Sequence, residues 1–141
     1  MWIRAARPIV TEAQRRFGTI AALGIVQIFA WGSSYYLPAV LSQPIAADTG
    51  WPLPLVSGGI SIALLGSGLL APRIGRLIAD RGGRDVLIGG LVMLAAGLVV
   101  LAMASSLPVY ALGWLAIGAG MSATLYDAAF STLGRYYGYG A

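Results

Sequence analysis

Four apolar stretches, each long enough to cross a lipid bilayer, constrain the fold of this chain more than any other feature. They cover residues 20–41, 55–79, 86–104 and 108–135. A membrane-spanning helix needs about 20 apolar residues, and it pairs its backbone polar groups internally, as lipid requires. The chain is 10% charged, whereas soluble domains are roughly 25% charged. The sequence therefore predicts an all-α membrane protein with four transmembrane helices.

The loops between these spans alternate in charge. All nine basic residues are arginines. Four precede the first span, four lie in the last turns of the second span and in the loop that follows it, and Arg135 ends the fourth span. The first loop carries only Asp48, and the third loop has no charge. Because cytoplasmic loops are enriched in Lys and Arg, we expect both termini and the middle loop to face the cytoplasm. Residues 1–17 are then a cytoplasmic arm, and residues 18–141 are the membrane region of a multi-pass protein of the inner (plasma) membrane.

The residue types present argue against several kinds of site. The chain has neither Cys nor His, so it lacks thiolate metal ligands and the commonest general base. No nucleophile–base pair can be named, and we predict no enzyme activity, no metal and no cofactor. The net charge of +4 comes from arginines beside apolar runs. That placement favours the anionic inner leaflet of the bilayer as a partner, and not nucleic acid.

Small residues within the second, third and fourth spans predict how the helices associate. Membrane helices pack through close backbone approach, because lipid tails are as apolar as leucine side chains. We expect this role for Gly58, Gly59, Gly66, Gly68, Gly89, Gly90, Ala96, Gly97, Gly113, Gly118, Gly120 and Ala123.

The first span carries polar and aromatic side chains on one helical face. Gln27, Trp31, Ser34 and Pro38 recur at spacings of four, three and four residues, and Tyr35 lies beside them. Lipid cannot satisfy these polar groups, so the face must point toward other helices or a wet cavity. Two interpretations stay open: hydrogen bonding and aromatic packing between helices, or a substrate path lined by Gln27, Trp31, Ser34 and Tyr35.

The charged loop from Gly75 to Asp85 turns the chain between the second and third spans. Gly82 and Gly83 can adopt the left-handed conformation that ends a helix. Asp85 precedes the third apolar run and is predicted to be its N-cap. Asp80 lies near the C-terminal end of the second helix, where the helix macrodipole disfavours an anion. Its position therefore indicates a specific role beyond the local structure.

This loop resembles the signature loop of the major facilitator superfamily, which joins the second and third spans on the cytoplasmic side. The core Asp-Arg-x-Gly-Arg is matched position by position by Asp80, Arg81, Gly83 and Arg84. A glycine, Gly75, precedes the core, one residue earlier than in the family's pattern, where this chain has Arg76. The basic residue that usually follows the core is Asp85 in this chain.

The resemblance implies a 12-helix fold of two six-span halves around a central cavity, of which this chain would supply the first four helices. It also implies that Asp80 helps to latch one conformation against a helix end in the second half. The family's arginine upstream of a Gly-x-Gly pair in the fourth span is Trp114 here.

Asp127 is the only acidic residue inside one of the four apolar stretches. Such residues mark buried pairs or pathways. The resemblance makes Asp127 a candidate partner of Arg84, in a structural ion pair. The alternative is a site that binds a proton or another coupling cation.

The sequence thus predicts the N-terminal portion of a secondary transporter that moves a small solute by alternating access, together with further C-terminal helices of the same chain. Four spans are too few for a whole transporter of this family. One alternative is a self-contained four-span exporter that dimerises, like the small multidrug exporters. Another is a membrane scaffold that transports nothing.

Overall fold

The computed structural model describes residues 11–124, which form helices and short connections with no β-strand in that range. The helices are α1 (Glu12–Ser33), α2 (Leu37–Thr49), α3 (Leu53–Ser57), α4 (Gly59–Arg81), α5 (Gly83–Ala102) and α6 (Leu107–Thr124). Four segments are long and apolar enough to cross a membrane: Glu12–Thr49, Leu53–Arg81, Gly83–Ala102 and Leu107–Thr124. The prediction of an all-helical chain with four potential spans is confirmed at this level.

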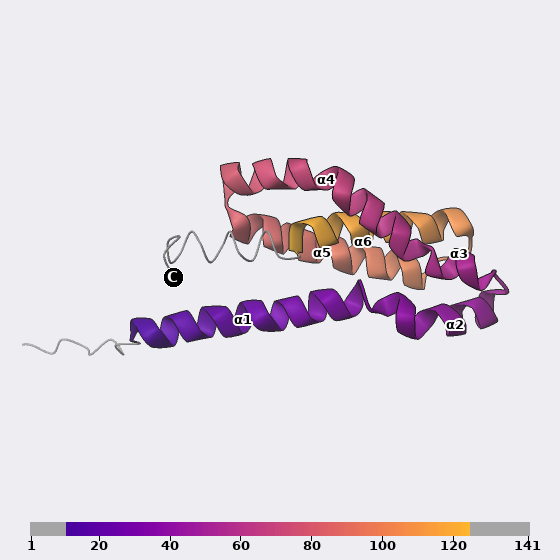
Figure 1. The fold of residues 1–141 in the computed structure, drawn as a ribbon, viewed down its shortest axis with the longest axis horizontal. Coiled ribbons are helices and arrows are strands. Elements are labelled where there is room, and N and C mark those ends of the chain that lie inside the picture. The colour runs from indigo at the N-terminus through magenta and orange to yellow at the C-terminus, as the bar shows by residue number, and fades with distance from the viewer. Residues whose placement is uncertain (1–10, 125–141) are drawn as a thin grey trace, which may run out of the picture.

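Helices α4, α5 and α6 pack together as one group, and α1 and α2 lie along one side of it (Figure 1). The N-terminal end of α1 and the junction between α4 and α5 are at the same end of the molecule. The connection from α2 to α3 and that from α5 to α6 are at the opposite end. Arg15, Arg16, Arg81 and Arg84 therefore lie toward one end, and Asp48, in the last turn of α2, lies toward the other.

Helix α6 is the centre of the core because small residues let its neighbours approach closely. A Cβ atom added to Gly118 would lie 2.8 Å from Cα of Ala63 in α4. One added to Gly120 would lie 2.7 Å from the backbone nitrogen of Leu94 in α5. Both contacts are with backbone, so these glycines set the spacing between helices. Most of the large side chains buried at these contacts also belong to α6: Tyr110, Trp114, Ile117 and Met121.

The predicted packing role holds for some of the small residues and not for others. Close contacts with a neighbouring helix involve Gly59, Gly90, Gly97, Gly113, Gly118, Gly120 and Ala123. Gly68 and Gly89 have no such neighbour within 4 Å, and Ala96 is exposed. Gly66 makes only an ordinary van der Waals contact with Leu115, and Gly58 meets the backbone of its own turn. Spacing along a helix cannot show which face meets a neighbour, which explains the difference.

The first span is broken near its middle. Helix α1 ends at Ser33, and α2 begins at Leu37. Pro38 explains the break, since its ring clashes with the carbonyl of Ser34 and it has no N–H to bond that carbonyl. The face predicted to run from Gln27 to Pro38 is therefore divided between two helices.

Several predicted boundaries differ from the observed ones. The first span was predicted to end at residue 41, but α2 continues through Gln43 and Pro44 to Thr49. The helix of the first span begins at Glu12 rather than near residue 20, so the end of the predicted arm is helical. Gly58 interrupts the second span between α3 and α4. The boundaries differ because hydropathy shows only where the apolar part of a helix lies, whereas the ends of the helix depend on the capping residues.

We expect Pro38→Ala to join α1 and α2 into one helix. Ser34 and Tyr36 already have φ and ψ values in the right-handed region. A new N–H at position 38 could then complete the missing hydrogen bond to Ser34. Hydrogen–deuterium exchange measured on peptides covering residues 34–39 should slow by about tenfold or more.

Pro44→Ala is the matched control, because α2 already runs through Pro44. It should leave exchange at the break unchanged. Equal exchange in Pro38→Ala and the parent protein would show that another residue causes the break.

Candidate functional site

The predicted substrate face of α1 meets the core at Gln27. Its Nε2 donates a hydrogen bond to the backbone carbonyl of Thr124 in α6, at 2.6 Å. Its Oε1 is buried and has no hydrogen-bond partner in the part of the chain that the structure describes. An unpartnered amide oxygen costs about 1–3 kcal/mol when buried. Gln27 thus links the first span to the fourth and keeps one polar atom for another group.

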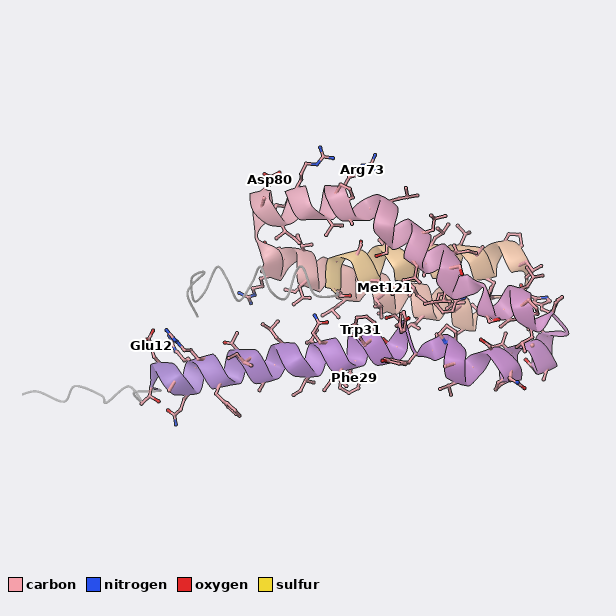
Figure 2. The ribbon with its side chains drawn as sticks, in the orientation of Figure 1. Glu12, Phe29, Trp31, Arg73, Asp80 and Met121 are labelled. Carbon is pink, nitrogen blue, oxygen red and sulfur yellow. The ribbon has the colours of Figure 1, made fainter. Side chains whose placement is uncertain are left out.

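A groove of about 550 Å³ runs along the same face and is lined by Gln27, Ile28, Trp31, Gly32 and Tyr36. Trp31 lies on the side of α1 that faces the other helices, whereas Phe29 points away from them (Figure 2). The first span is thinly covered here. In the most apolar 18-residue stretch of the first span only 11% of the residues are buried, whereas 56% are buried in α6. The groove therefore combines aromatic rings, an amide and space beside a broken helix.

Aromatic rings cluster at the break itself. The rings of Trp31 and Tyr35 meet edge to face, with centroids 5.2 Å apart, and those of Tyr35 and Tyr36 do so at 5.5 Å. Both tyrosines are exposed. Such rings present apolar faces and hydroxyl groups together, which suits recognition of organic solutes.

Ser34 lies next to these rings but is used differently. Its side chain is fully buried, and its hydroxyl donates to the carbonyl of Ala30 one turn earlier. That bond satisfies a carbonyl near the end of α1. Of the four predicted path residues, Gln27 and Trp31 line the groove, Tyr35 packs against Trp31, and Ser34 closes the helix end.

The signature-loop residues lie at the junction of α4 and α5. Asp80 and Arg81 form the last turn of α4, and Arg84 is in the first turn of α5. Asp80 is exposed on the outer side of α4, on the side away from α1 (Figure 2). Within residues 11–124, no ion pair joins Asp80 to an arginine. Gly75 lies within α4 and has no neighbour within 4 Å, and Gly83 is the buried first residue of α5.

Gly82 alone connects the two helices. Its φ of 91° is positive, and its N–H donates to the carbonyl of Ile78. Gly83 is helical, so one glycine makes the turn that the sequence assigned to two. The prediction of Asp85 as the N-cap is wrong. Gly82 occupies that position, and Asp85 lies in the first turn, where the helix dipole still favours an anion.

Arg84 faces the first span. It lines a groove of about 500 Å³ together with Gln14, Arg15, Thr19 and Leu87. The arginines of α1 and α5 thus approach the same end of the molecule from two helices. Asp127, the predicted partner of Arg84, lies outside the described residues.

A further cavity, which the sequence did not predict, lies at the end of the molecule where α2 leads into α3. Its volume is about 310 Å³, and its walls come from α2, from the end of α5 and from α6. Polar and aromatic side chains there include Ser42, Asp48, Trp51, Tyr110 and Trp114. The spacing of Ser42, Ile45 and Asp48 in α2 could have indicated a shared face. No pattern in the sequence placed that face against α6.

A scan against protein-family models finds no family that matches the chain, and searches of curated proteins and of solved structures find no match either.

Proposed function

We propose that this chain forms the first four membrane spans of a secondary transporter of the major facilitator type, which carries a small organic solute by alternating access. The observation that carries the proposal is the broken first span. Its Gln27 amide and Trp31 ring line an open groove beside a segment that is long and apolar enough to cross a membrane. Transporters build solute sites where helices are interrupted, because the exposed backbone and polar side chains are tolerated only beside a cavity.

The unequal packing of the helices also supports the proposal. Helix α6 is held to α4 and α5 by backbone contacts at glycines. Helix α1 makes few contacts with the same group, and Gln27 provides a hydrogen bond between them. A weakly held span beside a rigid group can move relative to it without unpacking the core.

The charged junction fits the same proposal. Asp80 and Arg81 end α4 at the side of the molecule where α1 begins. Asp80 points away from the described helices (Figure 2), as a residue that latches onto further helices would. We propose that Asp80 stabilises one of the two conformations and that Arg84 acts from the opposite side of the same junction.

Cysteine accessibility tests this proposal directly, because the chain contains no Cys. Trp31→Cys places a single thiol in the groove, and Phe29→Cys places one on the side of α1 that faces away from the other helices. In native vesicles of either orientation, we expect a membrane-impermeant thiol reagent to modify position 31 from both sides. Position 29 should stay unmodified, since lipid covers it. Modification of position 31 from neither side would contradict the proposal.

The latch is tested in the Trp31→Cys background. The ratio to measure is the rate of modification at position 31 from one side of the membrane divided by the rate from the other. Asp80→Asn should change this ratio by about threefold, which is the effect of losing one exposed ion pair between Asp80 and its proposed partner helix. Asp85→Asn removes the same charge nearby and should leave the ratio unchanged. Access from one side alone, insensitive to Asp80→Asn, would favour a scaffold.

A further inference from the structure

The cavity of about 310 Å³ between α2, α5 and α6 is separate from the groove at the break in the first span. Leu37, Leu41 and Ile45 line it from α2, and Leu98 and Leu101 line it from α5. Its volume is at the lower end of the range for small-molecule sites, about 300–1,000 Å³. It lies at the end of the molecule where α2 leads into α3 and α5 leads into α6.

One wall of the cavity holds an unsatisfied hydroxyl. Ser42 is 7% exposed, and its Oγ has no hydrogen-bond partner among residues 11–124. Other serines and threonines in these helices bond a carbonyl of the preceding turn, as Thr49 does to Ile45 at 2.6 Å. A buried hydroxyl without a partner costs about 1–3 kcal/mol. A polar ligand in the cavity would supply the missing partner.

Among the described residues, the charge at this end of the molecule is negative and has no opposite charge beside it. Asp48 lines the cavity and is exposed. It is the only charged residue between Phe17 and Pro72, and residues 86–124 contain none. It also lies in the last turn of α2, where the helix dipole adds negative potential. The local structure does not stabilise the Asp48 carboxylate, whereas a cation bound in the cavity would stabilise it.

Three aromatic rings also line the cavity. The rings of Trp51 and Tyr110 meet edge to face with centroids 5.5 Å apart, and those of Tyr110 and Trp114 do so at 6.2 Å. Tyr110 is fixed by a hydrogen bond of 2.7 Å from its hydroxyl to the carbonyl of Val56. Aromatic faces attract organic cations, most strongly where water is excluded.

We propose that this cavity binds a small organic monocation of the ammonium class that carries an apolar group. Asp48 supplies the counter-charge at the mouth, the aromatic row supplies the apolar and cation–π surface, and Ser42 supplies a polar contact inside. This site does not depend on the proposed transport function, since binding alone is claimed.

The test uses the 141-residue chain in lipid nanodiscs and two probes of similar size. Benzyldimethylammonium carries one positive charge and one N–H donor at pH 7, and N,N-dimethylbenzamide is neutral. We expect calorimetric titration to show saturable binding of the cation and at least about tenfold weaker binding of the amide. Asp48→Asn should weaken cation binding by about tenfold, and Ser42→Ala by about threefold.

Glu12→Gln is the matched control, because it removes an acidic charge in the first turn of α1, at the opposite end of the molecule from the cavity. It should leave the dissociation constant of the cation unchanged. Equal affinity for the two probes, or an affinity insensitive to Asp48→Asn, would show an apolar crevice only and would overturn the proposal. Absence of binding in the correctly folded parent chain would overturn it as well. None of these outcomes bears on the thiol accessibility of position 31.

Discussion

Replacing Gly118 by Ala should destabilise the helix group more than any other single-methyl change among the described residues. The added Cβ would lie 2.8 Å from Cα and 2.9 Å from the carbonyl carbon of Ala63. These are backbone atoms, so no side chain can rotate away, and α4 and α6 must separate. Overpacking of this kind costs about 1–3 kcal/mol or more. Unfolding by a denaturing detergent, followed by tryptophan fluorescence, should show the loss.

Gly68→Ala and Gly89→Ala are the controls for this prediction. Both glycines lie within helices, and neither has a neighbour within 4 Å of the position of the new methyl group. Their free energy of unfolding should stay the same or rise slightly, since Ala favours a helix more than Gly does. If Gly118→Ala were as stable as these two, α4 and α6 would not be in contact at Ala63.

Gly82→Ala should have the second-largest effect. The residue combines a φ of 91° with a ψ of 152°. Residues other than glycine adopt this backbone conformation only at a cost of about 1–3 kcal/mol. No neighbouring residue can take over the turn, because α4 ends at Arg81 and α5 begins at Gly83. The same unfolding measurement should show a loss of that size.

Gly75→Ala is the comparison, since Gly75 is helical and unobstructed two turns before the junction. It should not lower stability. Wild-type stability in Gly82→Ala would mean that the junction can be made with an ordinary backbone conformation. The positive φ would then not be required.

The helices of this chain were largely predictable from local patterns. The apolar runs set the four potential spans, and Gly82 with Pro52 set two of the turns. Pro38 could also have been interpreted as a break, because a proline inside a helix removes a hydrogen bond wherever it occurs. The spacing of the polar residues instead placed Pro38 on a continuous helical face, and the span was predicted to end at residue 41, before Pro44, which α2 accommodates.

The candidate sites were less predictable because they depend on which faces meet. Spacing placed Gln27 and Trp31 on one side of a helix, and both line one groove in the structure. Spacing did not show that Ser34 would bond its own helix, nor that Gln27 would reach the carbonyl of Thr124.

Composition and periodicity by themselves determined that this chain is helical, that it suits a membrane, and that its arginines are separated from Asp48. Those properties follow from hydrogen bonding and hydropathy along the chain, which act over a few residues. The tertiary structure alone decided which glycines touch, that α6 is the core, and that Ser42, Asp48 and Tyr110 border one cavity. Those features depend on contacts between residues far apart in sequence, and their geometry is set only when the helices pack.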